Sequence, residues 1–265
     1  MNNELTPAEH SQFSQSGYLI RHQPTFSSDK FARLKRYAED LFDRAAAGGA
    51  EPTLIDCPHW GDPAMFEWIG TPEMLSMVEP ILGPDIGVFA CHFLQKPPTV
   101  GKRVPWHEDS AYWGTVLAPM TIASITVALE PSLPENGCLR VIPGTQRHGY
   151  SDYAPVANPD QQVFGIEVKA GQYDESKAVD ITLQPNEASI HEGRIIHGSN
   201  PNQGTLRRAV FTVRYFPLTS KFQPETNEYF KQGFHIYQVQ GSDRAGNRYS
   251  DPTQSYTPNP LAKTS

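Results

Sequence analysis

A series of short apolar segments, separated by turn-forming residues, is the feature that most limits what this chain can fold into. Residues 121–129 alternate in polarity and are rich in β-branched residues, which is typical of a β-strand. Further segments of this kind occur at residues 86–96, 138–142, 179–183, 188–191, 194–199 and 206–216. Many short strands after a helical opening predict a mainly β fold with flanking helices, a jelly-roll or double-stranded β-helix barrel of the cupin-like kind.

Three helices are expected in the first third of the chain, over about residues 7–16, 28–47 and 72–82. The first has Thr6 as its N-cap and ends at Gly17. The second is stopped by Gly48-Gly49, and the third has Thr71 as its cap and Gly83 as its stop. We expect all three to be packing elements without chemistry.

The length and composition predict one domain over residues 1–265. Residues 152–178 are polar and turn-rich and are expected to be a lid insertion over the site, whereas residues 252–265 are expected to be a loose tail. The net charge of −7 argues against nucleic acid or an anionic membrane, which leaves small molecules as the expected partners. Three widely spaced cysteines and the lack of a signal segment favour a cytoplasmic location. The oligomeric state stays open.

The stretch Trp106-His107-Glu108-Asp109 suggests a metal site. If it continues as a strand, His107 and Asp109 share one face and Glu108 points away as a solvated or second-layer group. Two such groups cannot complete the coordination of a divalent metal, so a third ligand must come from elsewhere. His197 is the best candidate, and His191, six positions earlier, is the competitor.

A predicted hairpin supplies the reason for choosing His197. Residues 201–204, Pro-Asn-Gln-Gly, separate two apolar segments, so they read as its loop. A register centred on this loop places His197 opposite Arg208, on the same face. A register shifted by one residue would place Arg207 there instead. An arginine beside the metal could bind a carboxylate with two hydrogen bonds. The two histidines and one carboxylate match the arrangement that suits non-haem Fe(II).

With these motifs the chain resembles the phytanoyl-CoA dioxygenase family of Fe(II)/2-oxoglutarate-dependent oxygenases. The resemblance extends loosely over residues 5–251 and is strongest between Trp106 and Tyr215. The matching segments are residues 106–113, residues 135–145 (Glu-Asn-Gly-Cys-Leu-Arg-Val-Ile-Pro-Gly-Thr), the His197-Gly198-Ser199 motif, Arg207-Arg208 and Arg214-Tyr215.

The resemblance implies that His107, Asp109 and His197 hold Fe(II), and that Arg208 binds the distal carboxylate of the co-substrate 2-oxoglutarate. Gln95 and Ser199 are further candidates for contacts with the co-substrate. Dioxygen (O2) would take the remaining metal position, and a C–H bond would be oxidised with release of succinate and CO2. Related halogenases have a small residue in place of Asp109, so an aspartate favours hydroxylation, desaturation or cyclisation over halogenation.

Plainer interpretations stand beside these. A His-x-Asp pair alone is a weak signal, His92 reads as a hydrogen-bonded core histidine, and Arg214 reads as structural. A hydrolytic metalloenzyme could use the same ligands, and a non-catalytic ligand-binding jelly-roll protein is a third possibility. The substrate is expected to be a small metabolite or a natural-product intermediate, and the sequence does not identify it.

Overall fold

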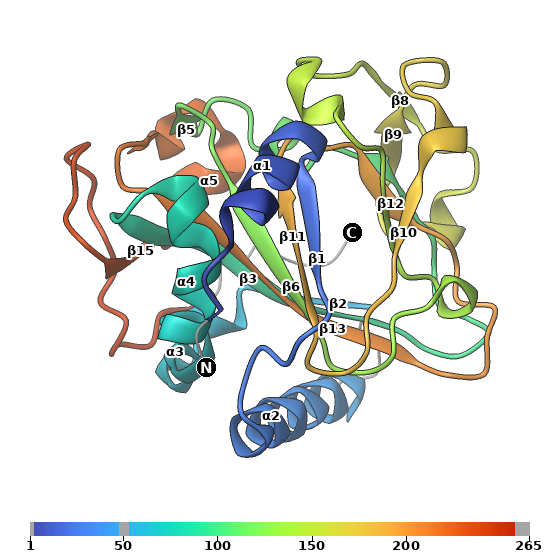
Figure 1. The fold of residues 1–265 in the computed structure, drawn as a ribbon, viewed down its shortest axis with the longest axis horizontal. Helices are drawn as coiled ribbons and strands as arrows, with labels where there is room; N and C mark the ends of the chain where they lie inside the picture. The colour runs from blue at the N-terminus through green and yellow to red at the C-terminus, as the bar shows by residue number, and fades with distance from the viewer. Residues whose placement is uncertain (1–2, 48–52, 258–265) are drawn as a thin grey trace.

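A computed structural model describes residues 3–47 and 53–257, in which antiparallel strands form two facing sheets and helices cover the outside of the larger one (Figure 1). The predicted mainly β jelly-roll with flanking helices is thereby confirmed, although the sheets are not closed into one barrel. Within the described residues, no helix is long and apolar enough to cross a lipid bilayer.

The larger sheet has the order β1-β11-β6-β13-β3-β15, and β2 pairs with β3. Its longest strands, β3 and β13, lie side by side and form its centre. The strand bounds are β1 Tyr18–Arg21, β2 Leu54–Asp56, β3 Ile86–Lys96, β6 Ala123–Ala128, β11 Ala188–Glu192, β13 Arg208–Pro217 and β15 Tyr237–Gln240.

The smaller sheet has the order β10-β7-β12-β4. Its strands are β4 Val104–His107, β7 Leu139–Val141, β10 Val179–Ile181 and β12 His197–Ser199. Two short two-stranded sheets complete the fold, and they are β5 Leu117–Ala118 with β14 Lys221–Phe222, and β8 Tyr153–Pro155 with β9 Ile166–Val168. The β8–β9 pair lies within the segment predicted to be a lid, so this segment has regular structure of its own.

The three predicted helices, α1, α2 and α4, begin and end close to the predicted residues, and two short helices, α3 and α5, were not predicted. They are α1 Pro7–Ser16, α2 Ser28–Ala47, α3 Phe66–Ile69, α4 Pro72–Leu82 and α5 Glu228–Lys231. Thr6 and Glu9 form a capping box at α1, and Gly17 ends that helix with φ +79°. Thr71 precedes α4 as predicted, but its hydroxyl donates to Trp68 O instead of capping the helix. The predicted Gly48-Gly49 stop lies outside the described residues.

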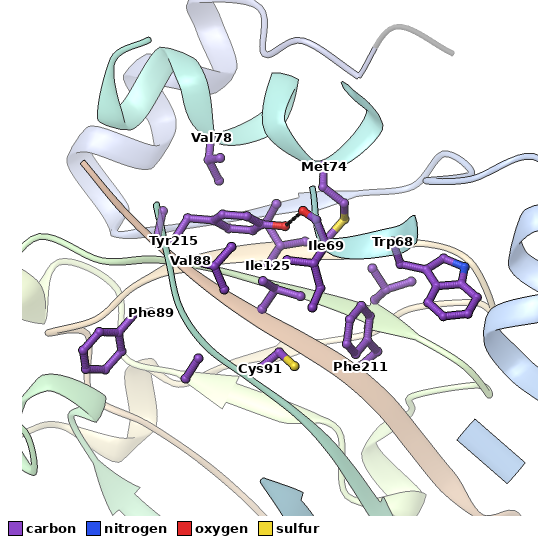
Figure 2. Close-up of a cluster of buried hydrophobic side chains, with 14 of the residues drawn as sticks. Trp68, Ile69, Met74, Val78, Val88, Phe89, Cys91, Ile125, Phe211 and Tyr215 are labelled. Carbon is purple, nitrogen blue, oxygen red and sulfur yellow. Dashed lines mark hydrogen bonds between the residues drawn. The ribbon is translucent and has the colours of Figure 1, made fainter. Parts of the chain in front are cut away.

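The main hydrophobic core lies on the outer face of the larger sheet, beneath the helices. Phe93 and Phe211 stack across β3 and β13 with ring centroids 4.8 Å apart, and Phe42 of α2 meets Phe93 edge-on. Under α3 and α4, the buried Tyr215 hydroxyl donates to Ile69 O at 2.7 Å (Figure 2). This packing fixes β3 and β13, so the inner face of the sheet is available for other groups.

The inner face of the larger sheet is polar and faces a cavity. Thr126 and Thr212 hydrogen-bond across β6 and β13 at 3.0 Å. Asp56 lies directly opposite His92, and His191 lies directly opposite Ser124. Polar groups buried on a sheet face cost free energy unless they are bonded, so this face indicates a site for polar or charged ligands.

The start of the predicted tail is packed against the body of the protein. Tyr256 N donates to Trp60 O at 2.6 Å, and the Tyr256 ring lies 4.3 Å from the His235 ring. The rest of that prediction falls on residues 258–265, outside the described part of the chain.

Candidate metal centre

A cavity of about 830 Å³ lies between the two sheets and holds the candidate site. Its wall includes His107, Asp109, His197, Arg208 and Ser199, all of which the sequence had singled out. A volume of this size suits a small molecule together with a co-substrate.

His107, Asp109 and His197 converge at one end of the cavity. One ligand atom from each lies within 4.8 Å of the others, and all three residues are buried. Asp109 Oδ1 is 3.6 Å from His107 Nε2 and 3.9 Å from His197 Nε2. These donor atoms would need to move slightly closer together to bind one metal ion. Two imidazoles and a carboxylate are the ligand set that suits non-haem Fe(II), and they leave its other coordination positions open.

The backbone fixes the ring orientation of both histidines. His107 Nδ1 lies 2.8 Å from Pro105 O, and His197 Nδ1 lies 2.9 Å from Ile195 O. A carbonyl oxygen only accepts hydrogen bonds, so each Nδ1 carries the proton and each Nε2 is left to bind a metal. Burial and the nearby His107 keep the pKa of His197 well below its usual value, which favours the neutral ligand form.

His107 and Asp109 do lie side by side, as predicted. The expectation that one continuous strand would align them is wrong. Strand β4 ends at His107, and a short 3₁₀ helix begins at Asp109, so strand alternation does not align them. Glu108 points elsewhere, as expected, but it is fully buried rather than solvated. It accepts hydrogen bonds from Ser151 and from the Tyr153 hydroxyl, which tie the turn to the β8 segment.

Arg214 binds both oxygens of the Asp109 carboxylate, which the sequence reasoning missed. Its Nε donates to Oδ2 at 2.9 Å and its Nη2 to Oδ1 at 3.1 Å. Burial alone would raise the pKa of Asp109, but Arg214, with His107 and His191, holds it well below its usual value. The carboxylate is therefore ionised, as a metal ligand must be.

The predicted hairpin between His197 and Arg208 is also wrong. β12 pairs with β4 and β7 in the smaller sheet, whereas β13 belongs to the larger sheet. The connecting loop is bound to its surroundings instead of turning back, because Asn202 Nδ2 donates to Lys96 O and Asn202 N to Gly101 O. The chain thus crosses from one sheet to the other.

Arg208 reaches the cavity from the facing sheet, directly opposite Lys96 of β3. Burial lowers the pKa of Arg208 to about 10, and burial together with Arg208 keeps the pKa of Lys96 well below its usual value. Lys96 Nζ donates to Ser199 Oγ at 2.6 Å. Lys96 Nζ also donates to Ser199 O and Asn200 O, so its donors are used, and Lys96 is not among the residues that line the cavity. Arg208 does line the cavity, and within residues 3–47 and 53–257 no carboxylate forms an ion pair with it, so this part of the wall favours an anion.

Two residues predicted to contact the co-substrate, Arg207 and Gln95, do not line the cavity. Arg207 points outward and forms ion pairs with Glu39 of α2 and with Glu130, so the alternative register does not bring it to the site. Gln95 is buried near Arg207, at 3.5 Å from its Nη1, and is not among the residues that line the cavity. Ser199 does line it.

Two more histidines lie in the cavity wall. His191 Nε2 is 3.8 Å from Asp109 Oδ2, its ring is buried, and neither ring nitrogen has a hydrogen-bond partner. The three-residue set that converges on a metal position contains His197 and not His191. His92 Nδ1 accepts from Arg214 Nη1 at 2.7 Å, which confirms the prediction of a hydrogen-bonded histidine.

The two facing sheets carry a His107, Asp109 and His197 set whose donor types match the 2-His-1-carboxylate class of mononuclear metal centres. The chain belongs to the phytanoyl-CoA dioxygenase (PhyH) family, whose model matches residues 7–210.

Two curated relatives illustrate the range of the family. The peroxisomal phytanoyl-CoA dioxygenase of Homo sapiens is 30% identical over 151 residues, which are 54% of this chain and 43% of the human protein. The ectoine dioxygenase of Sphingopyxis alaskensis is 23% identical over 241 residues, 83% of this chain and 78% of that protein. The chain thus spans less than half of the human relative but most of the bacterial one.

Solved structures share the fold. The apo form of ThoJ, a non-heme monooxygenase, matches with a TM-score of 0.73 and 21% identity over 93% of this chain and 88% of that one. EctD from S. alaskensis, with 2-oxoglutarate and 5-hydroxyectoine, matches with a TM-score of 0.68 and 22% identity over 84% and 80%.

Proposed function

We propose that the protein is an Fe(II)- and 2-oxoglutarate-dependent dioxygenase that hydroxylates, or otherwise oxidises, a C–H bond of a small molecule and releases succinate and CO2. One observation carries the proposal. The metal-binding set of His107, Asp109 and His197 and the guanidinium of Arg208 line the same cavity.

Arg208 would hold the distal carboxylate of 2-oxoglutarate. It is oriented by hydrogen bonds to Ser132 Oγ at 3.2 Å and Gly137 O at 2.9 Å. A guanidinium fixed in this way offers its remaining donors to a carboxylate. The keto acid end of the co-substrate would then extend toward the metal ligands.

The ligand residues prepare the centre for a divalent ion. His107 and His197 present their Nε2 atoms, because each Nδ1 faces a backbone carbonyl, and Arg214 keeps the Asp109 carboxylate ionised and aligned. Fe(II) bound there would supply the positions at which 2-oxoglutarate and O2 react. Phe164 packs against the His107 ring at 5.0 Å and helps to keep bulk water from the ligands.

The test is succinate formation under air with Fe(II), ascorbate and 2-oxoglutarate, across a panel of small metabolites. We expect turnover that requires all four and a product one oxygen heavier, or two hydrogens lighter, than its substrate. Asp109→Ala should abolish turnover and greatly weaken iron binding, whereas Asp43→Ala, which removes an exposed carboxylate of α2, should change neither. Turnover without O2 or 2-oxoglutarate would instead indicate a hydrolytic metalloenzyme.

A further inference from the structure

Asp56 lies at one end of the polar row that crosses the inner face of the larger sheet. It is the last residue of β2 and lies directly opposite His92, which in turn faces Thr212 of β13. Directly opposed residues project on the same face of a sheet. Asp56 therefore points into the same cavity as the metal ligands, and it forms part of the cavity wall.

The charges that line the cavity leave Asp56 without a cationic partner. Asp109 is paired with Arg214. Among the described residues, Asp56 forms no ion pair, and its carboxylate accepts hydrogen bonds from Cys57, with Sγ at 3.7 Å, and from the Cys57 backbone. The side chain is exposed on the cavity wall, and desolvation by the surrounding protein raises the pKa of Asp56 even though Arg214 acts to lower it. A carboxylate in such a place is stabilised by a cation.

Aromatic rings also line this cavity. Phe89 is central, with ring centroids at 4.8 Å from Trp113, 5.7 Å from Phe230 and 5.0 Å from Phe234. A shift in register between β13 and β3 next to Phe89 places both Phe89 and Ala90 in the cavity wall. Aromatic faces attract flat apolar groups and also cations.

We propose that the substrate is an amine with an aromatic or similarly flat body, whose protonated nitrogen pairs with Asp56 while its body packs against Phe89, Phe230 and Phe234. The proposal rests on the proposed function, because it names the substrate class of the same cavity. Two groups of the cavity wall then have opposite preferences: Arg208 takes the anionic co-substrate, and Asp56 takes the cationic substrate.

Binding can be tested with three probes that share one ring and a similar chain and differ in charge. These are 2-phenylethylamine, 2-phenylethanol and 3-phenylpropanoate, titrated by calorimetry into the anaerobic protein loaded with Fe(II) and 2-oxoglutarate. We expect the amine to bind at least about tenfold more tightly than the alcohol, and the acid to bind most weakly. In Asp56→Asn the preference for the amine should disappear. It should persist in Asp43→Asn, which makes the same charge change on an exposed part of α2.

Equal binding of the three probes, no amine binding at the highest concentration, or a preference that survives in Asp56→Asn would each overturn the proposal. The charge-transfer absorption of the Fe(II)–2-oxoglutarate complex is recorded in the same samples. If that absorption forms and the amine preference is absent, the substrate class is wrong and the proposed function stands. If it fails to form while an Asp56-dependent amine preference is present, the amine site stands and the dioxygenase function is wrong.

Discussion

Arg214 donates to both oxygens of Asp109, with Nε–Oδ2 at 2.9 Å and Nη2–Oδ1 at 3.1 Å, so one side chain orients the only carboxylate of the metal-binding set. A carboxylate oxygen has two lone pairs, so Oδ1 can accept from Arg214 and still bind an ion. Arg214 is itself held by His92 and by the Trp113 ring at 5.4 Å. The metal centre of the smaller sheet is thus aligned by a residue of the larger one.

Replacing Arg214 by glutamine should weaken iron binding by at least about tenfold and lower the free energy of unfolding by about 3–5 kcal/mol, because it leaves the buried Asp109 unpaired. Iron titration and urea unfolding measure the two effects. Arg33→Gln is the matched control, since Arg33 pairs with Glu67 at the surface, where the loss should stay below about 1 kcal/mol. An equal decrease in the free energy of unfolding in the two variants would show that the ion pair of Arg214 with Asp109 contributes no more than a surface pair.

Arg208→Ala should raise the dissociation constant for 2-oxoglutarate by roughly 30-fold or more, which corresponds to at least about 2 kcal/mol for a desolvated ion pair. The charge-transfer absorption of the anaerobic iron complex gives this constant without a substrate. Arg207→Ala is the neighbouring control and should leave it unchanged, because Arg207 pairs with Glu39 and Glu130 outside the cavity. If Arg207→Ala weakened 2-oxoglutarate binding and Arg208→Ala did not, Arg207 would be the residue that binds the co-substrate.

His197→Ala should lose tight iron binding, whereas His191→Gln should keep one iron per chain. The reason is geometric: His197, and not His191, converges with His107 and Asp109 on one metal position. Metal analysis of the purified variants, after loading with Fe(II) under anaerobic conditions, separates the two cases. Loss of iron from His191→Gln alone would assign the third ligand to His191.

Acid should destabilise the metal-free protein in a way that His92 helps to set. Burial, with Arg214, keeps the pKa of His92 well below its usual value. In the unfolded chain this histidine takes up a proton near pH 6.5, whereas in the folded chain it stays neutral. The free energy of unfolding therefore decreases as the pH is lowered below about 6.5. Unfolding free energies measured between pH 8 and pH 5 should decline, and the decline in His92→Gln should be smaller by up to about 1.4 kcal/mol per pH unit. An identical slope in the variant would contradict the assignment.

Local patterns predicted the three main helices and the longer strands, but not the short helices α3 and α5 or the short strands such as β8 and β9. The capping box of Thr6 and Glu9 and the glycine at position 17 set the ends of α1, and these features depend only on near neighbours in the chain. The three side chains predicted to bind the metal lie in distinctive short motifs, and the structure brings His107, Asp109 and His197 together. The prediction of a continuous strand through His107 and Asp109 was wrong, because β4 ends at His107 and the chain leaves the sheet before Asp109.

The predicted hairpin failed for a different reason. Turn-forming residues at 201–204 do indicate a change of direction, but they do not show which strand the chain pairs with afterwards. Contacts of Asn202 with Lys96 and Gly101 send the chain to the other sheet. Arg208 reaches the cavity nevertheless, because the two sheets face each other.

The sequence alone determined the three main helices, the longer strands and which side chains have the chemistry to bind iron, because these depend on residue type and short-range periodicity. Only the tertiary structure decided the partnerships of Arg214 with Asp109, of Lys96 with Arg208, and the position of Asp56 in the cavity. Those pairs join residues far apart in the chain. They are set by the packing of β3 and β13 beneath the helices, which no local pattern encodes.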